Sequence, residues 1–182
     1  GGLPTLLVDA GGGWNDPTHD VVRRLVAPPL AVCEAASNLA PFRANPRWPA
    51  AWRDADRRIR ALADRHLAAT PWFEGHIIRR LLDALPAGEA LSCANSLPIR
   101  QLDTWSAARP EPLSVFCNRG VSGIDGQVST LAGLCHGGWP AWGLIGDLSF
   151  CHDLGGLLQT ERLDRPLLLL NNGGGRIFDY LP

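Results

Sequence analysis

The sequence predicts an α/β fold with a parallel sheet that is covered by helices on both faces. Three observations lead to this prediction. From residue 90 onward, short apolar segments alternate with helix-like segments, which is the order of elements in a parallel sheet. The apolar segments are continuous rather than alternating, as in strands buried on both faces. A polar motif follows each of them, and ligands bind beyond the carboxyl ends of the strands in such sheets.

Length and composition are those of a globular protein. The 182 residues suffice for one domain and a small part of another, with 46% hydrophobic and 19% charged residues. A net charge of −1 gives no general attraction to nucleic acid or anionic lipid, so we expect no nucleic-acid partner and only local anion binding. No apolar run approaches the roughly 20 residues of a membrane span.

The five cysteines are an odd number and lie mostly in or beside apolar runs. This is typical of free buried thiols in a reducing compartment, so we predict a cytoplasmic protein. Cys135-His136 and Cys151-His152 lack the spacing of zinc ligands.

The first part of the chain contains short elements. Leu3–Ala10 predicts a buried strand that ends at three glycines. His19–Val26 predicts a short helix or an extended connection, and Leu30–Ala40 predicts a helix or another strand. The proline-rich segment Pro41–Pro49 predicts an irregular linker and a domain boundary. The chain opens without methionine and stops after an apolar cluster, so we interpret both ends as cut from a longer protein.

Two helices are predicted next. Ala50–Ala69 has apolar residues at helical spacing, and its arginines alternate with acids, which indicates a solvated face rather than a nucleic-acid surface. Thr70-Pro71 ends this helix. A second helix runs from Phe73 to Leu85, where Pro86-Ala87-Gly88 stops it.

The remaining elements form the predicted sheet. The helices between its strands are expected over Ile124–Cys135 and Phe150–Leu158, with Ser122 or Asp125 as a cap of the first. The four strands are expected over Ala90–Ala94, Leu113–Cys117, Ala141–Ile145 and Leu167–Leu170.

Two of the motifs at the strand ends predict a magnesium and diphosphate site. Gly146-Asp147-Leu148-Ser149 follows one strand, and Asn172 follows the next, within Asn171–Gly175. Asp147 would supply a carboxylate oxygen, Asn172 an amide oxygen, and the glycine loop a backbone carbonyl. Mg²⁺ takes few protein ligands and fills its octahedron with phosphate oxygens and water. Ser149 would donate to the diphosphate at a helix N-terminus. The structural alternative is an Asp cap and a glycine-rich turn.

The other two motifs carry arginines. Arg100 belongs to Asn95–Arg100, and Arg119 belongs to Asn118–Gly126. A tight turn would explain the glycines of the second motif but not Arg119, whose planar fork suits a carboxylate. Both arginines would flank one opening and bind an anionic substrate. Arg100 taken alone is equally typical of a surface ion pair.

These motifs give the chain a resemblance to a known family. Residues 90–182 resemble the diphosphate-binding domain of thiamine diphosphate enzymes, with their Gly-Asp-x followed by Asn-Asn. Within that superfamily the strand-end motifs are similar to those of the family of synthases that make 2-succinyl-5-enolpyruvyl-6-hydroxy-3-cyclohexene-1-carboxylate (SEPHCHC) in menaquinone biosynthesis. Leu148, where most relatives carry glycine, favours this family. Val8–Pro17 resembles the end of its central domain.

The resemblance implies a fold and an activity. The fold would be the thiamine diphosphate-binding fold, with residues 1–45 as the remnant of the central domain, 46–72 as linker and helix, and 73–182 as a C-terminally truncated diphosphate-binding domain. The activity would be a transferase that decarboxylates 2-oxoglutarate and adds the succinyl-semialdehyde carbanion to isochorismate, using thiamine diphosphate and Mg²⁺, or Mn²⁺ in its place.

The resemblance also implies residue roles. The carbonyl of Gly174 would join Asp147 and Asn172 on the metal, Ser96 would join the two arginines at the substrate, and Ile124 would support the bent cofactor. Further cofactor contacts are implied for Asn95, Ser122, Gly123, Gly146, Leu148, Ser149, Gly175, Ile177 and Phe178.

The family's catalytic glutamate lies in a pyrimidine-binding domain, outside this chain, and reaches the cofactor across a dimer interface. We therefore expect a homodimer or homotetramer for the whole protein, and an inactive fragment on its own. Two alternatives remain open, namely a non-catalytic binding or regulatory module that keeps the fold, and another thiamine diphosphate decarboxylase or carboligase.

Overall fold

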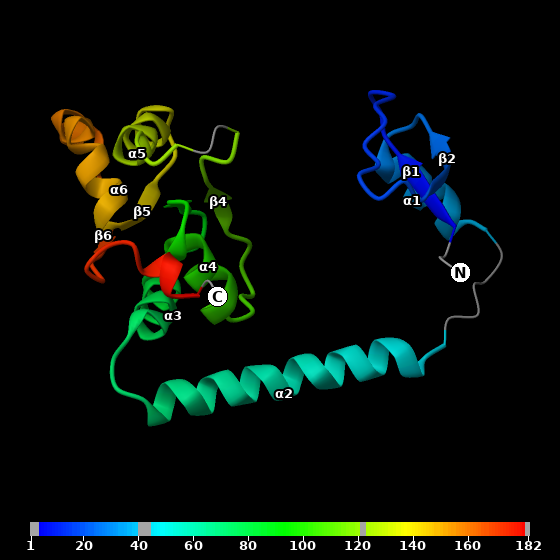
Figure 1. Ribbon diagram of the computed structural model, residues 1–182, viewed down its shortest axis with the longest axis horizontal. Coiled ribbons are helices and arrows are strands. Elements are labelled where there is room, and N and C mark those ends of the chain that lie inside the picture. The colour runs from blue at the N-terminus through cyan, green and yellow to red at the C-terminus, as the bar shows by residue number, and fades with distance from the viewer. Residues whose placement is uncertain (1–3, 40–44, 121–122, 181–182) are drawn as a thin grey trace. The chain divides into compact units, whose positions relative to one another are not determined.

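The computed structural model describes residues 4–39, 45–120 and 123–180 (Figure 1). The chain divides into two compact units at the boundary between Arg53 and Asp54. That boundary lies within one long helix, α2 (Arg47–Ala69). The domain limits predicted after residues 45 and 72 remain predictions.

The first unit contains two parallel strands, β1 (Thr5–Val8) and β2 (Val21–Leu25), and the helix α1 (Pro29–Ser37). Of the alternatives left open by the sequence, the extended form of the second segment and the helical form of the third are correct. The prediction that the first strand is buried is wrong, since no side chain within residues 4–39 is buried. Two strands and one short helix cannot cover both faces of a sheet.

Helix α2 begins three residues before the predicted start. The side-chain oxygen of Asn45 accepts a hydrogen bond from the backbone N–H of Arg47 at 3.0 Å, which caps the helix. Pro49 fits in the first turn because no intrahelical bond needs its missing N–H. The arginine-rich face is solvated as predicted, with Arg57 and Arg58 both paired with the exposed Asp54. None of the described helices is both long enough and apolar enough to cross a membrane.

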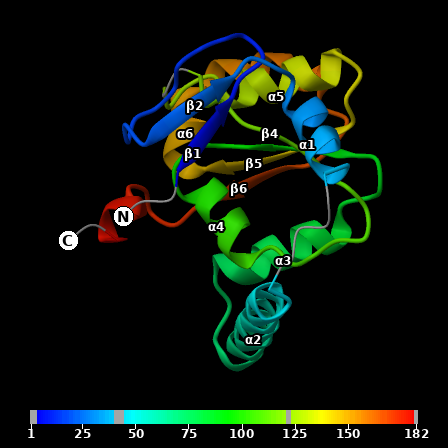
Figure 2. The ribbon, with the colours of Figure 1, turned by 90° about the vertical axis from the view of Figure 1, so that its right-hand side faces the viewer.

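The second unit contains a four-stranded parallel sheet with the order β4-β3-β5-β6. All four predicted strands are present, and each of their ends lies within one residue of the predicted one. Helices cover both faces (Figure 2), which confirms the predicted α/β class. The strands are β3 (Ala90–Cys93), β4 (Ser114–Phe116), β5 (Ala141–Gly146) and β6 (Leu167–Leu170).

Alternating residues of the strands form the core on the two faces. Leu91 of β3 packs on one face with Leu81 of α3 (Glu74–Ala84) and Leu102 of α4 (Leu97–Trp105). Its neighbour Ala90 packs on the opposite face with Leu131 of α5 (Gln127–His136). Burial of side chains on both sides explains why the strand sequences are continuously apolar.

Several elements differ from prediction. The helix α4 was not predicted; its Pro98 lies in the first helical turn, where a proline is well tolerated. Helix α5 begins at Gln127 after Gly126, whose φ is +71°, and no side chain of its own segment caps it. Instead, Asp153 accepts hydrogen bonds from the backbone N–H and hydroxyl of Ser129 in its first turn, at 2.8 and 2.9 Å. Asp125 is therefore not the cap, and Ser122 lies outside the described residues.

The segment after β5 is also organised differently. Helix α6 (Asp147–His152) begins three residues before the predicted Phe150, and the 3₁₀ helices η1 (Leu154–Arg162) and η2 (Arg176–Tyr180) follow. Gly156 allows η1 to lie against α5, because a Cβ there would stand 2.9 Å from the backbone nitrogen of Ser129.

All five cysteines are unpaired, but only Cys93 is buried. The prediction of buried thiols is therefore wrong for the exposed Cys33, Cys117 and Cys151. Burial, with a smaller contribution from Cys117, raises the pKa of the Cys93 thiol to about 12, so it stays protonated and acts as a core residue.

Candidate functional site

The register of β5 and β6 brings the two predicted metal ligands to one edge of the sheet. Gly146 pairs with Leu170, so Asp147 and Asn172 follow neighbouring strands where both end. Both side chains line one cavity of about 170 Å³, which we call the carboxyl-edge cavity. It collects most of the predicted cofactor residues: Asn95, Ile124, Gly146, Asp147, Leu148, Ser149, Asn172, Gly175, Ile177 and Phe178, together with Ser96.

Asp147 is the first residue of α6 and is half-buried. One of its oxygens, Oδ1, accepts a hydrogen bond from the backbone N–H of Leu148 at 2.9 Å. Within the described parts of the chain, Oδ2 has no hydrogen-bond partner. One carboxylate oxygen is thus fixed by the helix start, and the other is available to a ligand.

The glycine run after Asn172 has a backbone that other residues rarely adopt. Gly173, Gly174 and Gly175 have φ values of +85°, +76° and +66°. Asn171 holds this turn, since its side-chain oxygen accepts the N–H of Gly173 at 3.2 Å. A Cβ at Gly174 would lie 3.1 Å from the Leu148 side chain, so the loop packs closely onto α6. The two asparagines therefore differ in role: the first supports the turn and the second faces the cavity.

Asn95 supplies an unpaired acceptor in the cavity wall. Its Nδ2 donates to the backbone oxygen of Asn118 at 2.6 Å, and Asn118 in turn donates to Thr130 at 2.9 Å. Among the residues that the structure describes, its Oδ1 is one of the few buried polar atoms without a partner. Such an atom costs about 1–3 kcal/mol unless something binds it, so this wall of the cavity fits a polar ligand.

Ser96 has a strained backbone at the same edge. Its φ is +71° and its ψ is −132°, a region that residues other than glycine seldom occupy. Arg100 contacts it, because its Nη1 donates to the Ser96 carbonyl at 2.7 Å.

The two predicted substrate arginines line a different depression. Arg100 and Arg119 lie together on the walls of a hollow of about 600 Å³, which also contains Asp103. Neither lines the carboxyl-edge cavity. Arg100 contacts the Ser96 carbonyl, but the two arginines line a different hollow from the one that Ser96 lines. Their role at the substrate remains a prediction.

Two further predicted residues, both glycines, are not among the described residues that line the cavity. Gly123 is exposed and does not line the cavity, nor does Gly174, whose carbonyl is a predicted metal ligand. Ser122 lies outside the described residues. Ser149 is present but as the third residue of α6, buried at 7% exposure.

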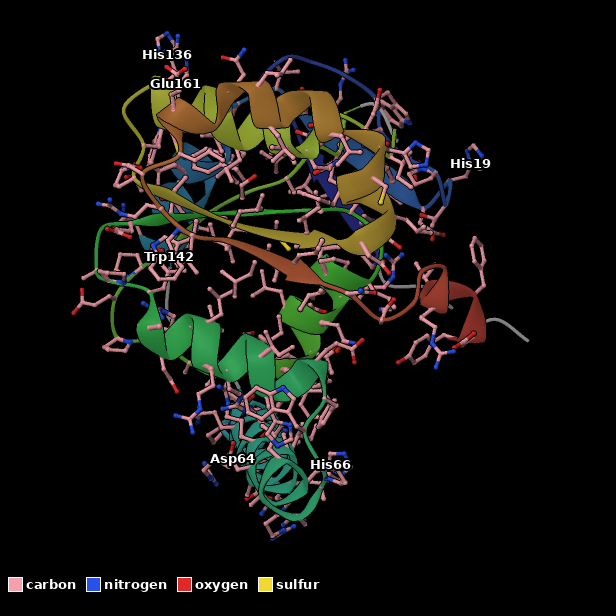
Figure 3. All side chains as sticks on the ribbon, turned by 90° about the vertical axis from the view of Figure 1, so that its left-hand side faces the viewer. His19, Asp64, His66, His136, Trp142 and Glu161 are labelled. Atoms are coloured by element: carbon pink, nitrogen blue, oxygen red, sulfur yellow. The ribbon has the colours of Figure 1, made fainter. Side chains whose placement is uncertain are left out.

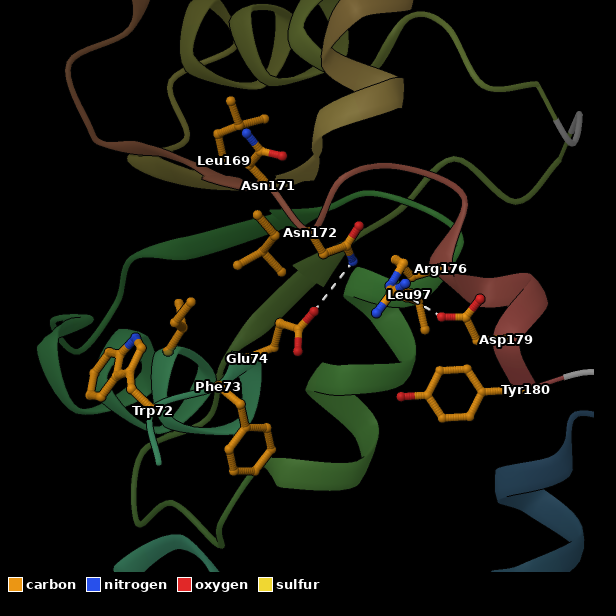
Figure 4. Close-up of a pocket in the computed structure, with 12 residues that line it drawn as sticks. Trp72, Phe73, Glu74, Leu97, Leu169, Asn171, Asn172, Arg176, Asp179 and Tyr180 are labelled. Atoms are coloured by element: carbon orange, nitrogen blue, oxygen red, sulfur yellow. Dashed lines mark hydrogen bonds and ion pairs between the residues drawn. The ribbon is translucent and has the colours of Figure 1, made fainter. Parts of the chain in front are cut away.

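Two polar residues at or beside the carboxyl-edge cavity were not predicted from the sequence. Arg176 lines the carboxyl-edge cavity. Glu74 contacts Asn172 but does not line this cavity; the Asn172 amide Nδ2 donates to the Glu74 carboxylate at 3.3 Å (Figure 4). Arg176 follows the glycine run directly and was detectable from that position. Glu74 is 98 residues away from Asn172, and no local pattern marks it.

The donor set fits a hard cation. No group of three or more His, Cys, Asp or Glu side chains that could hold a metal occurs in residues 4–39, 45–120 and 123–180. A metal in the cavity would be bound by one carboxylate, an amide oxygen and backbone carbonyls, with the remaining positions left to ligand oxygens. All-oxygen ligation with few charges suits Mg²⁺ or Mn²⁺ rather than zinc.

Comparison with known proteins finds similar sequences that share one name, although no protein-family model matches the chain. It is 43% identical over 180 residues to the SEPHCHC synthase of Geobacillus kaustophilus, covering 97% of this chain and 31% of that protein. The synthases of Bacillus velezensis and Chloroflexus aurantiacus are each 39% identical, over 187 and 184 residues, covering 99% and 97% of this chain and 32% and 31% of those proteins. The chain spans about a third of the length of these relatives.

Proposed function

We propose that this chain, similar over nearly its whole length to a segment of SEPHCHC synthases, is the part of such an enzyme that holds Mg²⁺ and the diphosphate of thiamine diphosphate. The observation that carries the proposal is the shared cavity, where Asp147 and Asn172 meet at the ends of β5 and β6. The buried, unpaired oxygen of Asn95 in the same wall supports a polar ligand there.

Each residue has a defined task in this proposal. Asp147 and Asn172, with the Gly174 carbonyl, would hold the cation, and Mn²⁺ would suit the same oxygens. The left-handed glycines would let diphosphate oxygens approach the backbone closely. Ile124 and Phe178 are 42% and 69% exposed, and a cofactor ring bound beside them would cover this apolar surface. Thiamine diphosphate would supply the reactive carbon for decarboxylating a 2-oxo acid and transferring the remainder.

The substrates of the proposed reaction are 2-oxoglutarate and isochorismate, both carboxylates. Arg100 and Arg119 line one depression, where their guanidinium groups would bind such anions. The product would be SEPHCHC in menaquinone biosynthesis, formed in the cytoplasm by a homodimer or homotetramer of the whole protein. The unpaired cysteines are consistent with that reducing compartment.

Calorimetry with thiamine diphosphate, in the presence and absence of Mg²⁺, tests the proposal on the 182-residue chain. We expect metal-dependent binding by the wild type. Asp147→Ala should weaken this binding more than about 100-fold. Even the loss of a residue that only orients a metal ligand lowers metal affinity about 10- to 100-fold. Binding without metal, or equal binding by the variant, would contradict the proposal. Asp125→Ala, an exposed acid outside the cavity, is the matched control.

A second test concerns the reaction. Because the catalytic glutamate is expected elsewhere in the whole protein, we predict no turnover of 2-oxoglutarate with isochorismate by this chain alone. The full-length protein should use 2-oxoglutarate in preference to pyruvate as donor. A preference for pyruvate would indicate another carboligase of the superfamily, and cofactor binding without any turnover by the full-length protein would indicate a binding module.

A further inference from the structure

We propose that Glu74 is a positioning residue, which turns the side-chain oxygen of Asn172 toward the cation. This inference rests on the proposed function. It concerns a residue outside the strand-end motifs, and it explains how an asparagine is kept in the orientation that a metal ligand needs.

The direction of one hydrogen bond carries the inference. The amide Nδ2 of Asn172 donates to Oε1 of Glu74 at 3.3 Å. An ionised carboxylate only accepts hydrogen bonds, so the nitrogen must face Glu74 and the amide oxygen must point elsewhere. In Figure 4 the Asn172 nitrogen points to Glu74 and its oxygen points away. A reversed amide would present N–H groups to the cation and could not bind it.

Asn172 lines two cavities, so its amide nitrogen can face one of them while its oxygen faces the other. One is the carboxyl-edge cavity with Asp147. The other, of about 690 Å³, contains Glu74. Arg176 and Asp179 also line this second cavity but are paired with each other at 3.1 Å. Within the described residues Glu74 has no ion-pair partner, so its carboxylate stays free to accept from Asn172.

Glu74 itself is held in place by the start of α3. It is the first residue of that helix, where the positive end of the helix dipole favours a carboxylate. The N–H of Phe73, the preceding residue, donates to Nδ1 of His76 at 3.3 Å. Because Nδ1 accepts, Nε2 carries the proton, and it donates to the carbonyl of Leu67 in α2 at 2.7 Å. His76 thus fixes the first turn of α3 to the end of α2.

An aromatic cluster fixes the same turn from the other side. The Phe73 ring contacts Trp105 edge-to-face at 5.1 Å, and His66 stacks on Trp105 at 5.8 Å. The cluster leaves no room for a side chain at Gly75, since a Cβ there would lie 2.6 Å from the Phe73 ring and 2.9 Å from Trp105. The carboxylate of Glu74 is therefore preorganised, as a group that orients a metal ligand needs to be.

Mn²⁺ binding in the presence of thiamine diphosphate, followed by electron paramagnetic resonance, tests the inference on the 182-residue chain. Glu74→Leu removes the acceptor and should weaken Mn²⁺ binding 10- to 100-fold. Glu74→Gln keeps an acceptor oxygen and should lose about fivefold or less. Glu161→Leu, at an exposed glutamate, should bind like the wild type. Equal losses in the Leu and Gln variants would overturn the inference, because the charge rather than the hydrogen bond would then matter.

A double substitution separates orientation from general damage to the fold. Asn172→Asp replaces the amide by a carboxylate, which needs no orientation. In that background Glu74→Leu should change Mn²⁺ affinity by less than about threefold, because no amide remains to be oriented. A loss as large as in the wild-type background would overturn the inference.

Nuclear magnetic resonance of the cofactor-free chain gives a readout that does not depend on the metal. The side-chain amide protons of Asn172 should exchange slowly in the wild type and Glu74→Gln, and faster in Glu74→Leu. Absence of Mn²⁺ binding by the wild type would overturn the proposed function and, with it, the role of Glu74. Wild-type binding together with unchanged binding and amide exchange in Glu74→Leu would overturn the inference alone.

Discussion

At the amino edge of the four-stranded sheet, where the strands begin, Glu89 is bound by two donors, whereas at the carboxyl edge Asn95 and Asp147 each have a side-chain oxygen without a partner among the described residues. Glu89, directly before β3, accepts hydrogen bonds from the indole of Trp142 in β5 and from Arg165, the latter at 2.6 Å. Figure 3 shows Trp142 at the opposite end of the sheet from η2. The Glu89 side chain is only 13% exposed, so these contacts at the amino edge are largely shielded from water.

The carboxyl edge has the opposite character. Asn95 has a buried oxygen without a partner among the described residues, and Ser96 has a left-handed φ of +71°. The same edge contains Asp147 and the glycine loop of the carboxyl-edge cavity. Unpaired and strained groups cost stability and are typical of functional sites. One end of the sheet therefore contributes stability, while the other loses some stability and fits a ligand.

The largest effect on stability is expected at the amino edge. Glu89→Ala leaves the Arg165 charge and the Trp142 N–H without their acceptor, and should lower the free energy of unfolding by about 2–3 kcal/mol. Urea denaturation measures this change. Cofactor binding, at the other edge, should stay within about twofold, since distant sites are nearly independent. Weaker cofactor binding in folded Glu89→Ala would show that the two edges are coupled. Glu161→Ala is the exposed control and should change stability by less than about 0.5 kcal/mol.

Two helical glycines give the next contrast. Gly75→Ala would push its Cβ against Phe73 and Trp105, and overpacking of this kind costs about 1–3 kcal/mol. It should also weaken Mn²⁺ binding, because the first turn of α3 carries Glu74. At Gly133 of α5 a Cβ meets nothing within 4 Å. Gly133→Ala should therefore be more stable than the wild type by roughly 0.5–1 kcal/mol. Thermal unfolding compares the two, and a stable Gly75→Ala with normal Mn²⁺ binding would contradict the account of α3.

The amino edge should also show a specific dependence on pH. Burial acts to raise the pKa of Glu89, but the hydrogen bonds from Trp142 and Arg165 and the Arg165 charge outweigh it and hold the pKa below its usual value of 4.5. A folded-state pKa below the unfolded one stabilises the protein above the unfolded value, and the contribution disappears as the pH falls through the folded value.

The wild type should therefore exceed Glu89→Gln in stability by about 1–2 kcal/mol near neutral pH. This difference should shrink below pH 4.5 as Glu89 takes up a proton. Urea unfolding of both proteins over a series of pH values measures it. A difference that grows in acid would mean that burial, not the hydrogen bonds, dominates the pKa.

A further small effect is expected from strain at the carboxyl edge. Ser96→Gly removes the penalty of a positive φ and should raise stability by about 1 kcal/mol after the greater chain entropy of glycine is counted. Ser92→Gly, four residues earlier in the buried strand β3, should instead lower stability by about 1 kcal/mol. Equal destabilisation by both substitutions would mean that Ser96 is not strained.

The sheet was predictable because its strands are continuous apolar segments between clear turn signals. β6 has the limits that its leucines predict, and the other three strands differ by one residue at one or both ends. Helix α4 was missed because Asn95–Arg100 was considered only as a polar motif at a strand end, although the helix begins within it. The caps were missed for a different reason: Asp153 caps α5 from 24 residues away, which local rules do not reveal.

The main residues of the candidate site were predictable, but the contacts that hold their side chains in place were not. Strand-end motifs identified Asp147 and Asn172, since parallel strands place their ends together. The contact of Glu74 with Asn172 depends on tertiary packing across 98 residues, and no spacing rule contains it. The arginines were predicted to join Ser96 at the substrate. Arg100 contacts the Ser96 carbonyl, but neither arginine lines the carboxyl-edge cavity.

The central claim is that Asp147 and Asn172 bind one cation at the carboxyl edge. Crystals grown with Mn²⁺ and thiamine diphosphate test it directly through the anomalous signal of manganese. The account predicts a single strong peak within about 2.2 Å of an Asp147 carboxylate oxygen and of the Asn172 amide oxygen, with diphosphate oxygens on the same ion. A peak bound to only one of these side chains, or lying outside this cavity with the cofactor present, would contradict it.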